Sequence, residues 1–125
     1  MTGRTRGFTL LELLVVMAII GTLLMIAVPR YFRSLERSKE AVLKQDLATL
    51  RESIDRFYGD TGKYPPTLQV LVDKSYLRGI PVDPVANAAD KWVVVNADLP
   101  EDSGIKDVKS GAEGAGENGV RYAEW

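Results

Sequence analysis

Glu12 is the only charged residue in the otherwise almost wholly apolar run from Phe8 to Val28. A carboxylate in hydrocarbon costs about 2.5–3.5 kcal/mol even on lenient insertion scales, so a compensating interaction is expected. One candidate is local, because the start of a helix lies near the headgroups and carries the positive end of the helix dipole. The other is a cation from a second copy. A cut between Gly7 and Phe8 would create a charged amino group one turn from Glu12, and that pair would fix the register between copies.

Histidine and cysteine are both absent from this 125-residue chain. Their absence excludes a Ser-His-Asp triad, a Cys-His pair, a histidine-ligated zinc site and any disulfide. No spacing of the remaining carboxylates, serines, lysines or tyrosines points to catalysis, so we expect no enzyme. With 16 basic and 17 acidic residues, the formal net charge is −1, and no nucleic-acid partner is expected.

The apolar run that carries Glu12 is long enough to cross a membrane. As a helix, residues 8–28 would extend about 31 Å, close to the thickness of bilayer hydrocarbon. A secretory signal peptide cut near Ala27-Val28-Pro29 is an alternative, but the run is longer than such peptides carry. The positive-inside rule does not decide the orientation. Basic residues lie on both sides of the run: Arg4 and Arg6 before it, and Arg30, Arg33, Arg37 and Lys39 after it.

Helical periodicity continues past Pro29. Apolar residues recur at intervals of three and four, which places them in one stripe: Leu43, Leu47, Leu50, Ile54 and Phe57. The other face carries two favourable four-residue charge pairs: Glu40 with Lys44, and Glu52 with Arg56. Glycines and prolines stop the pattern after residue 58. We therefore expect one helix over residues 8–58, kinked near Pro29.

The remaining sequence predicts a small mixed head. Thr67 can cap a short helix that runs through Val72, and glycine and proline over residues 75–89 predict a loop. Strands are expected at Trp92–Ala97, at Ile105–Lys109 and, most weakly, at Val120–Ala123. Residues 110–119 include four glycines and predict a loop. A long helix followed by a short antiparallel sheet makes an α+β fold.

The segment GFTLLELLVVMAIIGTLLMIAVPRY resembles the class III signal sequence of type IV pilins and type II secretion pseudopilins. The resemblance implies that a prepilin peptidase cuts after Gly7 and methylates the amine of Phe8. It implies that Glu12 guides subunit addition to a filament and that Pro29 kinks the helix. It also implies a cytoplasmic leader and a periplasmic head, with the chain held in the bacterial inner membrane before assembly.

The segments DLATLRESIDRFYGDTGKYPPTLQVLV and IPVDPV are similar to the major pseudopilin of type II secretion. The resemblance implies a pilin fold with four parts: a leader over 1–7, a transmembrane or filament-core helix over 8–29, its amphipathic half over 30–58, and a head over 59–125. It implies a homopolymer that drives protein export. The implied partners are other pseudopilins or minor pilins, the prepilin peptidase, an inner-membrane assembly platform and lipid. A type IV pilus subunit is the alternative, and a membrane-tethered binding module would leave Glu12 unexplained.

The same resemblance raises the question of calcium. Major pseudopilins typically hold a calcium ion in their last loop through aspartates and backbone carbonyls. The matching residues 109–121 offer Ser110, Glu113, Glu117 and Asn118 but no aspartate, whereas calcium takes six to eight oxygen ligands, roughly two or more from carboxylates. We therefore expect no metal and treat a calcium site as the secondary hypothesis; the simpler expectation is a solvated loop.

Overall fold

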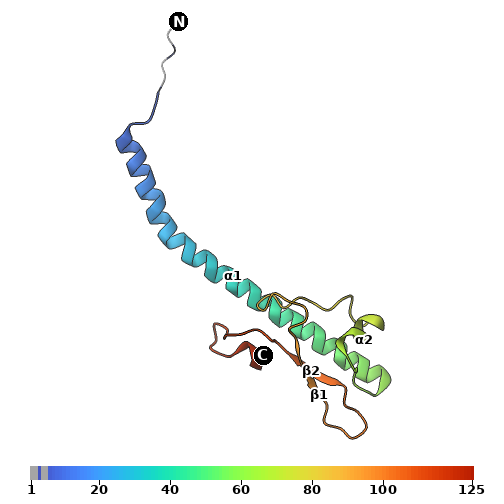
Figure 1. Cartoon of the computed structure of the whole chain (residues 1–125). Coiled ribbons are helices and arrows are strands. Elements are labelled where there is room, and N and C mark those ends of the chain that lie inside the picture. The colour runs from blue at the N-terminus through green and yellow to red at the C-terminus, as the bar shows by residue number, and fades with distance from the viewer. Residues whose placement is uncertain (1–2, 4–5) are drawn as a thin grey trace. The chain divides into compact units, whose positions relative to one another are not determined.

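The computed structural model describes residue 3 and residues 6–125. The predicted leader, including Arg4, lies partly outside the described residues. The chain divides into two compact units, Met1–Glu36 and Arg37–Trp125. Helix α1 (Leu10–Thr61) contributes to both units, its first part to one and its second part to the other. Figure 1 shows the helices and strands in sequence colours.

The ends of α1 differ by a few residues from the predicted helix, because local capping sets them. The helix begins after Thr9, whose side chain accepts a hydrogen bond from the backbone N–H of Glu12 at 3.1 Å. It ends at Thr61, before Gly62, which adopts the left-handed conformation with φ 73°. The Gly62 N–H donates to the carbonyl of Tyr58 at 2.8 Å, the usual way to close a helix with glycine.

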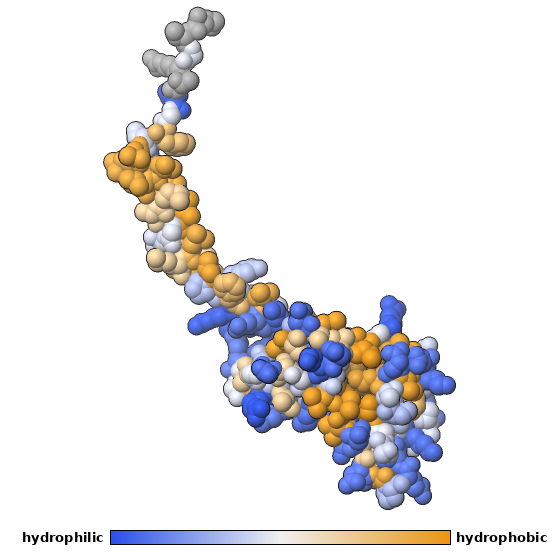
Figure 2. All heavy atoms as spheres, viewed as in Figure 1, coloured by the Kyte–Doolittle hydropathy of each residue, from blue (hydrophilic) through white to orange (hydrophobic). Residues whose placement is uncertain are grey.

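From Leu10 to Val28, α1 is apolar on every side apart from Glu12. The large apolar side chains from Leu10 to Val28 are all substantially exposed, and Figure 2 shows them as an almost continuous orange surface on the visible face. By length and composition α1 is suited to cross a membrane, and none of its most apolar window is buried. A helix that is apolar all round requires an apolar environment that this single chain does not supply.

The core of the second unit forms on one stripe of α1, as predicted. Five side chains of that stripe are buried: Leu43, Leu47, Leu50, Ile54 and Phe57. Trp92, Ile105 and Val108 belong to the same buried cluster. Helix α2 (Leu68–Asp73) adds Leu68 and Leu71, and its predicted cap is confirmed, because Thr67 accepts a hydrogen bond from the N–H of Val70.

The sheet is a single antiparallel hairpin beside the second part of α1 (Figure 1). Strands β1 (Val93–Asn96) and β2 (Ile105–Lys109) pair with Val94 opposite Val108. The third predicted strand is wrong. The chain turns at Gly119 (φ 79°) and forms the 3-10 helix η1 (Tyr122–Glu124) instead, leaving one isolated bridge between Ala115 and Arg121.

A buried polar junction connects the loop before the sheet to the segment after it. Asp83 and Ser110 are each 0% exposed. Oδ1 of Asp83 accepts from the N–H groups of Val85 and Ala86, and Oδ2 accepts from the Ser110 hydroxyl at 2.5 Å. Every polar atom of this carboxylate therefore has a partner, which is what burial of a charged group requires.

Candidate functional site

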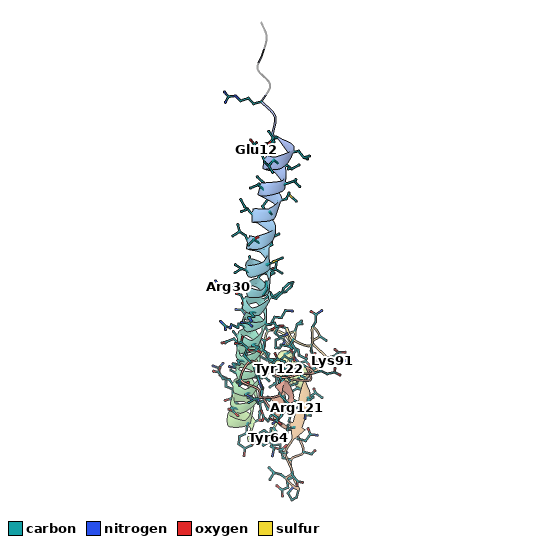
Figure 3. All side chains as sticks on the ribbon, turned by 90° about the vertical axis from the view of Figure 1, so that its left-hand side faces the viewer. Glu12, Arg30, Tyr64, Lys91, Arg121 and Tyr122 are labelled. Carbon is teal, nitrogen blue, oxygen red and sulfur yellow. The ribbon has the colours of Figure 1, made fainter. Side chains whose placement is uncertain are left out.

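The start of α1 places Glu12 in the first helical turn (Figure 3). Thr9 caps the helix, and its hydroxyl accepts from the N–H of Glu12, three residues on. A threonine followed three residues later by glutamate is the sequence signature of a capping box. Sequence reasoning missed this signature because it read Thr9 only as part of the apolar run. The position supports the local interpretation of Glu12, because the positive end of the helix dipole lies there.

Phe8 and Glu12 line one hollow on the surface of the first unit. The hollow has a volume of about 320 Å³, and its other lining residues are Leu11, Val15 and Val16. Phe8 is 85% exposed and precedes α1, so the predicted helix start at residue 8 is wrong. The cause is Thr9, because a cap residue ends the helix on its N-terminal side. The predicted place of the Phe8 amine, one turn from Glu12, concerns the chain cut after Gly7 and stays a prediction.

The Gly7–Phe8 bond lies in exposed, non-helical chain. A Cβ at Gly7 would meet nothing within 4 Å, so the surroundings do not shield this bond. An accessible segment without regular structure is the form in which peptide bonds are generally cleaved. The predicted processing residues are therefore adjacent, exposed and immediately outside α1.

Glu12 has no basic partner in the part of the chain that the structure describes. Its side chain is exposed among apolar neighbours. The intermolecular pair with the Phe8 amine of a second copy remains a prediction, and so does the kink at Pro29. Pro29 lies inside α1, where its ring supplies no N–H for the carbonyl four residues earlier.

A second functional feature was not predicted from the sequence. Four side chains of α1, which we call the polar row, contact the C-terminal segment that follows β2, residues 110–125: Arg37, Glu40, Lys44 and Arg51. Their spacings of three, four and seven residues place them on one side of the helix. That spacing was visible in the sequence, but nothing in it indicated the distant partners. The predicted Glu52–Arg56 pair is present at 2.6 Å, whereas Glu40 bonds to the C-terminal segment.

The members of the polar row differ in exposure and therefore in energetic weight. The Arg37–Glu117 pair, at 3.0 Å, has side chains 68% and 47% exposed, and such a pair contributes about 0–1 kcal/mol. Arg51 is half-buried and meets three acceptors: Asp107 Oδ1 at 2.8 Å, the Val108 carbonyl at 3.0 Å and the Trp125 carbonyl at 2.5 Å. Arg51 is thus the stronger attachment, since it bonds to a carboxylate and to two carbonyls together.

Comparison with known proteins identifies the class. A model of the prokaryotic N-terminal methylation motif matches residues 3–28. The chain is 31% identical to type II secretion system core protein G of Escherichia coli (strain K12), over 87% of this chain and 82% of that protein. It is 30% identical to core protein G of Pseudomonas aeruginosa, over 95% of this chain and 94% of that protein. The type IV major pilin protein PilA of Myxococcus xanthus is 41% identical over 49% of this chain and 28% of its own length.

The methylation motif and the long apolar helix that ends in an α+β head define a type IV pilin-like protein. Within that class, the chain belongs to the family of type II secretion system core protein G. No solved structure matches the chain significantly. The family is a family of structural subunits, and the apolar part of α1 makes this chain a membrane-anchored one.

Proposed function

We propose that the chain, once its leader is removed after Gly7, polymerises into a pseudopilus that drives protein export by type II secretion. The observation that carries this proposal is the first part of α1: an exposed helix, apolar on every side, with one carboxylate in its first turn. The similarity to core protein G over nearly the whole chain supports the same function.

The energetics of the apolar segment favour transfer between membrane and filament. Moving residues 8–28 from lipid into a bundle of identical helices brings little net hydrophobic gain, because both environments are apolar. The forces that remain are packing and the pairing of Glu12 with the Phe8 amine of a neighbouring copy. That pair lies in a low dielectric, where an unpaired carboxylate is costly. Register therefore depends on Glu12, and addition of subunits is suited to a machine-driven step.

The proposed location and partners follow from the same mechanism. The head, residues 59–125, would lie in the periplasm and the leader in the cytoplasm. Partners would be further copies of this chain, other pseudopilins, a prepilin peptidase acting at Gly7–Phe8 and an inner-membrane assembly platform. The exposed Gly7–Phe8 segment before α1 supports access by such a peptidase.

A type IV pilus subunit for adhesion, twitching or DNA uptake is the second candidate. The observation in its favour is the 41% identity to PilA of Myxococcus xanthus. That match covers 49% of this chain, whereas the match to core protein G of Pseudomonas aeruginosa covers 95%. The wider coverage of the match to core protein G favours the pseudopilus.

Replacement of Glu12 tests the assembly mechanism. Glu12→Ala is expected to insert into membranes normally and to abolish filament assembly, measured by sedimentation of sheared filaments. Glu36→Ala, which removes a carboxylate from the same helix outside the apolar run, is the matched control and should assemble. Thr9→Val removes the capping hydroxyl and keeps Glu12. Assembly by Thr9→Val but not by Glu12→Ala would assign Glu12 to pairing between copies. Normal assembly by Glu12→Ala would refute the pairing.

A further inference from the structure

We propose that the polar row of α1 closes the last loop of this chain, residues 109–121, and that the loop takes no calcium ion. Side chains of α1 hold the loop in place, a role that the resemblance to major pseudopilins assigns to a calcium ion. This inference concerns the isolated subunit and does not depend on the proposed function. The polar row and the last loop lie near opposite ends of the sequence of the second unit.

The acidic side chains of the loop do not form a metal site. Among residues that the structure describes, no three acidic side chains gather closely enough to hold a metal ion. The loop supplies two carboxylates, Glu113 and Glu117. Nε of Arg37 donates to both carboxylate oxygens of Glu117, each at 3.0 Å. A guanidinium on this carboxylate opposes a divalent cation at the same place.

Glu40 of α1 bonds directly to the loop and to the residue that follows it. Its Oε1 accepts the hydroxyl of Tyr122 at 2.8 Å and the N–H of Glu117 at 3.1 Å. A Cβ at Gly116 would lie 3.2 Å from this same oxygen and 2.5 Å from the Trp125 ring. The helix and the loop are therefore in direct contact here, and glycine at 116 permits that contact.

Several backbone carbonyls of the loop, including those of Gly114, Gly116 and Val120, accept hydrogen bonds from within the C-terminal segment. Gly119 N–H donates to the Gly116 carbonyl at 3.0 Å, and Gly116 N–H donates to the Val120 carbonyl at 2.9 Å. The Gly114 carbonyl accepts from Tyr122 N–H at 3.1 Å. Calcium sites in loops draw several of their oxygens from such carbonyls. Here the oxygens of Gly114, Gly116 and Val120 accept hydrogen bonds from backbone N–H groups of the same segment.

Cationic members of the row fix the end of the segment. Lys44 Nζ lies 5.1 Å from the centre of the Trp125 ring, a cation–π distance. Arg51 bonds to the Trp125 carbonyl and to Asp107 on β2, so one guanidinium attaches both the sheet and the end of the chain to α1. Positive charge lies along the surface on which the loop rests, and it favours acidic loop residues over a bound cation.

Hydrogen exchange of the full chain in detergent tests the proposal. Peptides covering residues 112–125 are expected to exchange at the same rate with calcium and with excess chelator. Glu40→Ala should raise exchange in those peptides roughly tenfold, since two hydrogen bonds are lost, and calcium should not reverse it. Glu36→Ala, one turn away on α1, is the matched control and should leave these peptides unchanged.

Two further variants keep the test decisive if Glu40→Ala does not fold. Glu117→Gln weakens the contact with Arg37, and Glu113→Gln removes a loop carboxylate for which the structure shows no hydrogen bond or ion pair. Faster exchange in Glu117→Gln but not in Glu113→Gln is the expected pattern. Slower exchange on adding calcium to the wild-type chain, or equal effects of both variants, would overturn the proposal.

Discussion

Ser110 and Asp83 lie 27 residues apart in the sequence and are joined by a 2.5 Å hydrogen bond in the interior of the second unit. Both residues are 0% exposed. The Ser110 hydroxyl also accepts from the N–H of Ala112 at 3.1 Å. One hydroxyl therefore satisfies a buried carboxylate and a backbone donor at once, and it connects the loop before the sheet to the loop that the polar row contacts.

Replacing Ser110 should therefore be costly. Ser110→Ala leaves an oxygen of Asp83 and the N–H of Ala112 without a partner, and we expect a loss of about 1–3 kcal/mol in the free energy of unfolding. Chemical denaturation of the chain in detergent measures it. Ser103→Ala, at an exposed serine, should change stability little. Equal stability of both variants would mean that the buried bond contributes nothing.

Gly111 is expected to tolerate no side chain. A Cβ there would lie 1.9 Å from the carbonyl oxygen of Lys91, so the backbone must move. Gly111→Ala should lower the melting temperature measured by circular dichroism. Gly79→Ala places the same methyl group where nothing lies within 4 Å and should leave the melting temperature nearly unchanged. An unchanged melting temperature for Gly111→Ala would contradict the close approach of Gly111 to Lys91.

The orientation of the apolar stripe of α1 predicts that substitutions at two adjacent residues differ strongly in their effect on stability. Leu43 is 0% exposed, whereas Val42 is 49% exposed. Leu43→Ala should destabilise by about 2–5 kcal/mol because it leaves a cavity in the core. Val42→Ala should stay within about 0.5 kcal/mol of wild type. Denaturant midpoints of the two variants decide whether the stripe is oriented as described.

The stability of the second unit should depend on the charge of Asp46. Burial raises the pKa of the Asp46 carboxyl, and the nearby Asp83 carboxylate raises it further. A raised pKa in the folded state favours folding below the unfolded pKa, and this contribution is lost as pH rises through the folded pKa. Asp46→Asn should therefore gain stability at neutral pH relative to wild type, and less at acidic pH.

Thermal unfolding of wild type and Asp46→Asn at acidic and neutral pH measures this difference. Asp55→Asn, at an exposed position on α1, is the control. A pH-independent difference between Asp46→Asn and wild type would contradict the predicted role of the charge.

The sequence predicted the features that depend on local patterns. The buried stripe from Leu43 to Phe57, the cap at Thr67 and strand β2 have the residues that short-range periodicity and turn chemistry indicated. Residues 120–123 were misassigned, because their contacts with Gly114 and α1 outweigh a weak strand propensity. The polar contacts that join distant segments, such as Ser110 with Asp83 and Glu40 with Tyr122, had no sequence signal.

The functional residues also divide into those found from a local motif and those that only the folded structure brings together. Gly7, Phe8 and Glu12 follow from one contiguous motif and were named from the sequence. The bond from Glu40 to Tyr122 spans 82 residues, and the bond from Ser110 to Asp83 spans 27. Each needs the folded head to bring its partners together, so pattern reasoning on one chain cannot find them.

The central claim is that this chain is processed and then assembled as a filament subunit. Mass spectrometry of the N-terminal peptide, taken from the protein in native membranes, tests this most directly. The account predicts a mature chain that begins at N-methylated Phe8. A chain that still begins at Met1, or one cut after Ala27 or Val28, would contradict it, because Phe8 would then offer no amine to pair with Glu12.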